Sequence, residues 1–351
     1  MSRSTKVAFA ASLAMAINLS QAHAASDVVT ITTWGGSYTT AMQKAFFEPF
    51  GKNSDIKIRE DQWDGSTARI QAMVDTQQVT WDLVSSTTNV ALQGCEEGWL
   101  EKIDYSKLGG KEKFMPGAAM ECGVAIDNYG IVFAYNKDKY PGGGPTTMAD
   151  FFDVNKYPGP RALYKGPKYT MEFALIGDGV KPSEVYKVLA TEEGVNRAFK
   201  KLDSIKPSIK VWWTAGAQPP QLLADGEVSM AISYDGRIQA AIKEYGKNLQ
   251  IVRDGQALDF DIWVIPKGAK NLAAAEKFLQ FTTTPKVAAG LSDYIAYGPA
   301  IPSAMPFVKP GIVNDLPNAP ENMTNSFTLS AEFWADHEQE LTERFNKWLA
   351  K

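Results

Sequence analysis

An arginine that follows a tyrosine and an aspartate at the end of a predicted strand is the first candidate for ligand chemistry. In the segment "AISYDGRIQ", Tyr234 ends the strand, and Asp235 and Arg237 follow around the turn at Gly236. A guanidinium binds a carboxylate through two parallel hydrogen bonds, so Arg237 is suited to hold the carboxylate of a ligand. The alternative is a salt bridge to Asp235 or to another surface acid, which contributes little when it is exposed.

Asp261 is a candidate of the opposite charge. It stands in "DFDIWVIP", directly before an apolar segment, which predicts that the side chain is partly buried. An unpaired carboxylate is costly in such surroundings, and a ligand ammonium would remove that cost. Asp259 and Asp261 are also able to cap a turn, so a structural role for the two acids remains open.

The first predicted strand ends at an aromatic residue beside two glycines. In "ITTWGGSYTTAMQKAF", Trp34 is followed by Gly35 and Gly36, and an amphipathic segment begins there. Glycines at a helix start allow backbone N–H groups to face an anion. The segment lacks both the Gly-x-Gly-x-x-Gly spacing and the Gly-Lys-Ser/Thr ending of phosphate-binding loops, so it leaves the ligand undefined. The alternative for Trp34 is an ordinary core position, because tryptophans are mostly buried.

Histidine usage argues against nucleophilic catalysis. Once a predicted leader that contains His23 is removed, His337 is the only histidine, and no serine or cysteine nucleophile pattern surrounds it. A Ser-His-Asp or Cys-His arrangement needs that residue. We therefore expect a binding protein rather than an enzyme, with no cofactor and no metal.

The first 24 residues predict export. Arg3 and Lys6 precede an apolar run over residues 7–17, and Ala22-His23-Ala24 places small residues at the −3 and −1 positions of a cleavage site. This is the layout of a secretory signal peptide, and the run is too short to cross a bilayer. The roughly 327 residues that follow exceed one ordinary core and suggest two domains.

Charge and cysteine content narrow the partners and the compartment. The chain has 36 basic and 40 acidic side chains, and removal of the leader takes two of the basic ones. A mildly acidic chain without a basic block argues against nucleic acid as a partner and against a basic membrane-surface role. Cys95 and Cys122 most simply pair in an oxidising compartment, with free buried thiols as the alternative.

Short apolar runs alternate with helical patterns, which predicts an α/β architecture. We expect strands over residues 28–34, 55–61, 81–86, 161–166, 209–213, 228–236 and 249–255, with helices over 39–54, 67–76, 184–205, 220–227 and 237–246. Trp212 and Trp213 end one of these strands. Because strand neighbours point to opposite faces, one of the two faces the core and the other a cleft, and Trp213 is nearer the strand end.

The ordered series "ITTWGGSY", "WDLVSST", "GWLEKIDYSKL", "PGPRALYKGP", "KPSIKVWWTAGAQPPQLLADGEVSMAISYDGR", "DIWVIPKGAKNLAAAEKFLQF" and "YIAYGPAIPSA" resembles the bacterial solute-binding proteins of ABC importers, in particular the spermidine/putrescine-binding family. The resemblance covers nearly the whole mature chain. It implies a periplasmic, monomeric protein that closes on a small solute and delivers it to a membrane permease.

The same resemblance implies a type II-like, two-lobed α/β fold, with two mixed sheets flanked by helices and joined by crossing strands. After the leader at 1–24, residues 25–134 would begin the first lobe and residues 135–264 would form the second. Residues 265–351 would return to the first lobe and add the C-terminal helices.

The resemblance also implies roles for single residues. Trp34 and Tyr38 match a pair of aromatics that stack on the ligand, and Tyr234 matches a stacking tryptophan. Thr87 matches a ligand-binding hydroxyl, with capping of the next helix as the alternative. The remaining matches are Asp261, which receives a ligand amine, and Tyr297, an aromatic residue at the pocket. Trp213 and Asp235 are further candidate ligand-binding residues because they stand next to these strand ends in the sequence. Glu172 is a weaker candidate.

Three positions depart from the polyamine-binding pattern. Asn89 and Asp259 stand where the family has aromatics, and Arg237 stands where a putrescine binder carries a carboxylate. Asp261 and Arg237 at opposite ends of an aromatic box suit a short zwitterion such as 4-aminobutyrate, and putrescine should bind less well. The alternatives are a secreted hydrolase with paired carboxylates, and a ferric-iron binder that uses Tyr294 and Tyr297.

Overall fold

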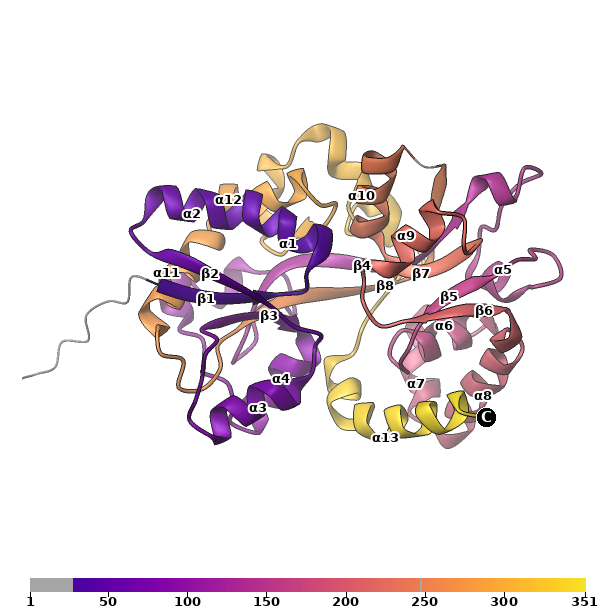
Figure 1. The fold of residues 1–351 in the computed structure, drawn as a ribbon, viewed down its shortest axis with the longest axis horizontal. Coiled ribbons are helices and arrows are strands. Elements are labelled where there is room, and N and C mark those ends of the chain that lie inside the picture. The colour runs from indigo at the N-terminus through magenta and orange to yellow at the C-terminus, as the bar shows by residue number, and fades with distance from the viewer. Residues whose placement is uncertain (1–27, 247) are drawn as a thin grey trace, which may run out of the picture.

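Two long strands run through the middle of the molecule and join its two sides. The computed structural model describes residues 28–246 and 248–351, so the predicted leader at 1–24 lies outside the described residues. Within those residues the strands form one ten-stranded mixed sheet in the order β2-β1-β3-β8-β4-β7-β5-β6, with β10 paired to β8 and β9 to β4. Helices lie on both faces of this sheet (Figure 1).

The strands are β1 (Val28–Thr33), β2 (Lys57–Gln62), β3 (Leu83–Thr87), β4 (Val124–Asn136), β5 (Arg161–Tyr164), β6 (Ile209–Trp213), β7 (Met230–Tyr234), β8 (Leu249–Val264), β9 (Gly298–Pro299) and β10 (Phe327–Thr328). The α-helices are α1 (Gly36–Met42), α2 (Glu48–Asn53), α3 (Thr67–Asp75), α4 (Thr88–Glu96), α5 (Met148–Phe152), α6 (Thr170–Gly177), α7 (Val185–Leu189), α8 (Glu192–Asp203), α9 (Gln218–Ala224), α10 (Asp235–Tyr245), α11 (Leu272–Thr282), α12 (Pro285–Gly290) and α13 (Ala331–Leu349). A π-helical turn, η1 (Gln43–Phe47), joins α1 to α2, and short 3₁₀ turns, among them η2 (Tyr105–Leu108), connect other elements.

The α/β class and the crossing strands are confirmed. Strands β1, β2 and β3 pair in parallel, and we call them the first half of the sheet. Strands β5, β6 and β7 also pair in parallel and form the second half. The expected two sheets are hydrogen-bonded into one, because β4 and β8 pair with each other along most of their length, β3 adds to β8, and β7 adds to β4.

Local sequence decides where helices begin. The pattern over 184–205 predicts one helix, but the structure divides it into α7 and α8. The first piece ends at Leu189, and Thr191 caps the second, because its hydroxyl accepts a hydrogen bond from the N–H of Gly194 at 3.0 Å. Acidic residues in the first turn of α8 and lysines in its last turn complement the helix dipole.

The C-terminal helix α13 packs on the second half of the molecule. Its Trp348 donates a hydrogen bond to Asp203 of α8 at 2.7 Å, and its Arg344 forms an ion pair with Glu192 at 2.7 Å. In Figure 1 the yellow helix α13 runs below α6 and α7, and its C-terminal end lies beside α8. Its N-terminal part also contacts α4, so α13 touches elements from both sides of the molecule. None of the described helices is long and apolar enough to cross a membrane.

Cys95 and Cys122 form the expected disulfide, with Cα atoms 5.4 Å apart. The bond closes a loop between residues 27 positions apart, which ties α4 to the segment before β4. Free thiols, the alternative, are therefore not found at these two positions.

Replacing both cysteines by serine is expected to lower the free energy of unfolding by about 3 kcal/mol, because the unfolded chain regains the entropy of an open loop. Chemical denaturation of the oxidised protein and of the double variant measures the difference. Neither cysteine lines the ligand cavity described below, so ligand affinity should be unchanged. Equal unfolding midpoints for the two proteins would contradict the prediction.

Candidate ligand-binding site

A cavity of about 890 Å³ lies where strands from both halves of the sheet end. Trp34, Thr87, Tyr164, Trp213 and Tyr234 stand at the carboxyl ends of β1, β3, β5, β6 and β7, and all of them line the cavity. Ligands of open α/β sheets bind at this edge. The other aromatic lining residues are Tyr38, Trp63, Tyr129, Tyr169 and Tyr297, and the charged ones are Asp64, Lys168, Arg237, Asp261 and Glu338.

Trp34 is held in a fixed plane on the wall of the cavity. Its ring stacks on Trp63, with centroids 5.1 Å apart and an interplanar angle of 25°. Its Nε1 donates a hydrogen bond to Oδ1 of Asp261 at 2.8 Å, which connects the end of β1 to β8. The indole is only partly buried, so it is a wall residue and not an ordinary core residue.

The Gly-Gly turn after Trp34 makes room for Arg237. Gly36 has a φ of 61°, and a Cβ atom at that position would lie 3.0 Å from Nη1 of Arg237. The same Nη1 donates a long hydrogen bond of 3.4 Å to the carbonyl oxygen of Gly35. The turn therefore faces a cation from α10, not an anion.

Arg237 is a buried cation without an acidic partner among the described residues. Its side chain is 6% exposed, it forms no ion pair there, and its Nε has no hydrogen-bond acceptor within that part of the chain. The salt bridge to Asp235 that the sequence left open is not formed. Instead, Asp235 pairs with Arg253 at 2.9 Å.

Asp235 does not line the cavity, so the structure does not bring it together with the other predicted residues. Its buried carboxylate accepts hydrogen bonds from the N–H groups of Gly130 and Gly236, at 3.1 and 2.8 Å, in addition to the ion pair with Arg253. These contacts connect the first residue of α10 to β4 and β8. Asp235 thereby positions the helix that carries Arg237.

Asp261 lies opposite Asp127 in the pairing of β8 with β4, beside an irregularity in the register of β4. Burial raises the pKa of Asp261 to about 7, although the hydrogen bond from Trp34 and the charge of Arg237 act in the opposite direction. Burial and then the nearby charge of Asp261 raise the pKa of Asp127 well above its usual value. The cavity therefore contains a carboxyl group that is easily converted between its neutral and charged forms.

The other predicted wall residues line the same cavity. The ring centroids of Tyr38 and Tyr297 lie 6.0 Å apart, and those of Trp213 and Tyr234 also lie 6.0 Å apart. Trp213 is the tryptophan that faces the cavity, because Trp212 packs against Phe345 and Trp348 of α13.

Thr87 also lines the cavity and does not cap α4 with its side chain. Its hydroxyl donates to Oδ1 of Asn89 at 2.8 Å. Glu172, the weaker candidate, lies outside the lining. It is fully buried and accepts hydrogen bonds from Tyr186 at 2.9 Å and from Trp334 of α13 at 2.7 Å.

Sequence reasoning missed several polar and aromatic lining residues, among them Trp63, Lys168 and Glu338. Trp63 directly follows β2, so the rule about strand ends would have found it. Lys168 precedes α6 in a loop, and Glu338 lies on α13, where no local pattern indicates which side faces a ligand.

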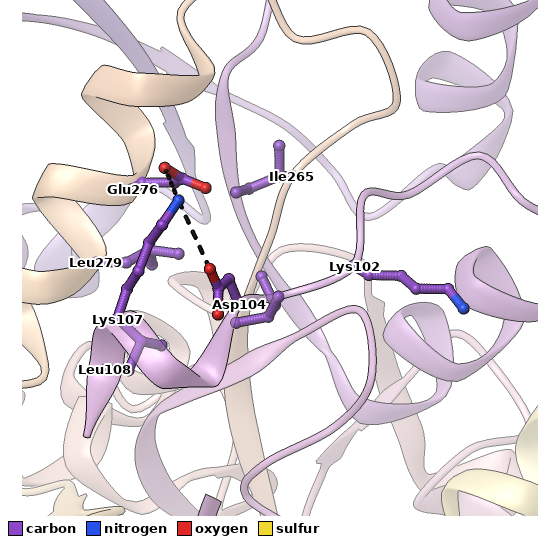
Figure 2. Close-up of a pocket in the computed structure, with 8 residues that line it drawn as sticks. Lys102, Asp104, Lys107, Leu108, Ile265, Glu276 and Leu279 are labelled. Atoms are coloured by element: carbon purple, nitrogen blue, oxygen red, sulfur yellow. Dashed lines mark hydrogen bonds and ion pairs between the residues drawn. The ribbon is translucent and has the colours of Figure 1, made fainter. Parts of the chain in front are cut away.

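A second hollow, beside η2 and α11, is too small for a ligand. It measures about 10 Å³, which is close to the space of one water molecule. Figure 2 shows that Lys107 reaches Glu276 and Asp104 there, at 2.7 and 3.7 Å, while Lys102 extends away from them. The large cavity between the half-sheets remains the candidate site.

The two halves of the sheet are joined by the crossing strands β4 and β8. The cavity between them has aromatic walls and contains both a buried cation and a buried carboxyl group. This arrangement defines a protein that encloses a small polar solute. The match with known proteins agrees: residues 45–321 match the bacterial extracellular solute-binding proteins. The chain belongs to this family, which is a family of binding proteins and not of enzymes.

Three comparisons give the range of relatives. The chain is 43% identical to the gamma-aminobutyric acid-binding protein of Pseudomonas aeruginosa, over 94% of this chain and 93% of the relative. It is 23% identical to the spermidine/putrescine-binding periplasmic protein of Escherichia coli, over 86% of each. The solved structure of the binding protein MotA from A. tumefaciens in complex with glucopine is 35% identical, has a TM-score of 0.86, and matches 92% of this chain and 99% of that one.

These findings confirm the family and do not favour the hydrolase or the iron binder. The two tyrosines that suggested iron are not brought together. Tyr297 is buried and lines the cavity, whereas Tyr294 is 50% exposed and is not part of the lining.

Proposed function

We propose that the protein captures a short ω-amino acid, with 4-aminobutyrate as the reference ligand. The observation that carries the proposal is that the buried side chains of Asp261 and Arg237 line one cavity, where Arg237 has no acidic partner among the described residues. The ligand ammonium binds Asp261, and the ligand carboxylate binds Arg237. Each ligand charge then replaces the water that the buried protein charge has lost.

Charge separates this ligand class from polyamines. A diammonium would bring a second cation toward Arg237, and water screens this repulsion less than at the surface because Arg237 is buried. The 43% identity to a gamma-aminobutyric acid-binding protein supports the proposal, and the identity to the polyamine-binding relative is lower, at 23%.

The aromatic residues form the walls around the carbon chain of the ligand. In this proposal Trp34, Tyr38, Trp213, Tyr234 and Tyr297 pack on its methylene groups, which gain apolar contact while both ends stay hydrogen-bonded. Thr87 offers its hydroxyl beside Asp261, its partner in the pairing of β3 with β8. Asp235 acts by positioning α10, not by contact with the ligand.

The wider role follows from the family. We assign the protein to the periplasm, reached through the leader at 1–24, where it works as a monomer and delivers the ligand to the permease of an ABC importer. Residues 25–134 begin one lobe and residues 135–264 form the other, with 265–351 returning to the first and adding α13. A hinge motion at β4 and β8 closes the lobes on the ligand.

Calorimetry on the mature protein tests the ligand. The protein is unfolded, stripped of any retained ligand and refolded, and 4-aminobutyrate and putrescine are then compared in one buffer. We expect tight binding of 4-aminobutyrate and at least about a hundredfold weaker binding of putrescine, because one buried charge pair is exchanged for a repulsion. Preference for putrescine would overturn the proposal.

A further inference from the structure

The cavity contains a second buried cation that the proposed function does not use. Lys168 is 7% exposed, lines the cavity, and donates a hydrogen bond from Nζ to Oδ1 of Asn89 at 2.6 Å. Within residues 28–246 and 248–351 it forms no ion pair with a carboxylate. A buried ammonium has three N–H donors, so one neutral acceptor leaves most of its hydrogen-bonding capacity unused.

Asn89 holds this ammonium in place through contacts from three separate parts of the chain. Its Nδ2 donates to Oε2 of Glu338 on α13 at 2.8 Å, which fixes the orientation of the amide. Its Oδ1 then accepts from Lys168 and from the Thr87 hydroxyl. Glu338 lies beyond residue 321, where the family match ends, so the part of the cavity around Lys168 is partly built by a segment outside that match.

Lys168 and Arg237 act on different parts of the cavity. The charge of Arg237 lowers the pKa of Asp261, whereas the charge of Lys168 lowers the pKa of Asp259. These two acids are two positions apart on β8, on the same face of the strand and about 7 Å from each other along it. The two cations also bind at different places, because Arg237 donates to the carbonyl oxygen of Gly35 after β1, whereas Lys168 donates to Asn89 at the start of α4.

The size of the cavity allows a ligand larger than 4-aminobutyrate. Its volume of about 890 Å³ is near the upper end of the range for drug-sized ligands. In the proposed function 4-aminobutyrate is held by Asp261 and Arg237 alone, and Lys168, which lines the same cavity, has no ligand group assigned to it. The buried lining groups, two cations and one carboxylate, are matched by a ligand with two carboxylates and one ammonium.

We infer that the site binds amino acids whose amine carries a second, anionic arm, an inference that rests on the proposed function. One carboxylate of such a ligand binds Arg237, its ammonium binds Asp261, and its second carboxylate binds Lys168. The competing role for Lys168 is to balance the buried carboxyl groups of Asp259 and Glu172, whose pKa values it lowers. In that case the ammonium would hold no ligand, and an anionic arm would gain nothing.

Three ligands that differ only at the nitrogen separate these roles. They are 4-aminobutyrate, N-(2-carboxyethyl)-4-aminobutyrate, and N-propyl-4-aminobutyrate, which has a neutral arm. Calorimetry measures each on the refolded protein and on the Lys168→Met, Lys168→Arg and Lys165→Met variants. Lys165 is exposed, lies in the same loop and does not line the cavity, so Lys165→Met is the matched control.

We expect the carboxyethyl ligand to bind the unchanged protein at least about tenfold more tightly than the propyl ligand, as for one hydrogen-bonded charge pair. Lys168→Met should reduce that ratio to about twofold or less, while Lys168→Arg and Lys165→Met keep it. A melting curve verifies that each variant is folded. Should Lys168→Met fail to fold, the ratio in the unchanged protein and in Lys168→Arg still decides the question.

The outcomes separate this inference from the proposed function. Equal affinity for the carboxyethyl and propyl ligands, with tight binding of 4-aminobutyrate, overturns the inference and leaves the proposed function standing. Persistence of the tenfold ratio in Lys168→Met also overturns it. Binding of the carboxyethyl ligand alone supports the inference and replaces 4-aminobutyrate as the reference ligand, whereas no binding of any of the three overturns both.

Discussion

Replacing Arg237 by glutamine is expected to weaken the binding of 4-aminobutyrate by about a hundredfold or more, because removal of one partner from a buried charge pair leaves the other charge desolvated. Arg237 is suited to this test since it is buried and forms no ion pair among the described residues. Its loss therefore breaks no salt bridge in the unliganded protein, and the effect should appear in affinity and not in stability.

Calorimetry measures the ligand affinity of the variant, and thermal unfolding measures its stability. Arg59→Gln is the matched control, because Arg59 lies exposed on β2 and does not line the cavity. Arg237→Asp should go further and shift the preference toward putrescine, since the new carboxylate can accept a second ammonium. Unchanged affinity for 4-aminobutyrate in Arg237→Gln would show that the carboxylate is held elsewhere in the cavity.

The sequence predicted the α/β class, and most of the residues that it predicted for the site line the cavity, several of them because of one rule. Trp34, Thr87, Trp213 and Tyr234 stand at or just after the ends of strands that hydrophobic patterns reveal, and the carboxyl ends of parallel strands meet at one edge. Asp261 lies inside a strand, not at its end, and it was found through its resemblance to a family position.

The remaining residues could not be predicted, because their positions depend on contacts between distant segments. Asp235 and Arg237 are both near the start of α10, but only Arg237 faces the cavity, since Arg253 of β8 binds Asp235. Lys168 reaches Asn89 from a loop far along the chain, and Glu338 reaches Asn89 from α13, which packs on α8 and β6. No local pattern in the sequence predicts how α13 packs on the rest of the molecule.

The paired carboxyl groups of Asp127 on β4 and Asp261 on β8 make the affinity for a ligand amine depend on pH. Asp261, whose pKa burial raises to about 7, must be ionised to hold an ammonium. The charged and titratable groups around it include Tyr38 on α1, Asp127 on β4, Asp259 on β8 and Arg237 on α10, together with the buried tyrosines Tyr129, Tyr234 and Tyr297. The ligand's own amine and carboxylate stay charged between about pH 5.5 and 8, so Asp261 dominates the change.

The sign follows from linkage. A carboxyl group whose pKa is raised by folding binds its proton more tightly in the folded protein, so its contribution to stability is present at low pH and is lost as the pH rises through about 7. Ligand binding runs the other way, because the ammonium pairs only with the ionised form. Affinity for 4-aminobutyrate should therefore be level above about pH 8 and fall about thirtyfold by about pH 5.5.

Two substitutions identify the group responsible for this pH dependence. Asp261→Asn cannot ionise, so its weaker affinity should be the same at both ends of the pH range. Glu172 is the matched control, because burial also raises its pKa to about 7 while it lies outside the cavity, between α6 and α13. Glu172→Gln should keep the thirtyfold change. A flat profile in this variant would instead show that the pH dependence comes from the packing of α13 and not from the ligand site.

Calorimetry also detects the proton that leaves Asp261. A carboxyl group that is protonated before binding must release its proton to the buffer, so the heats measured at about pH 6.5 should vary with the ionisation enthalpy of the buffer. Asp261→Asn should abolish that variation.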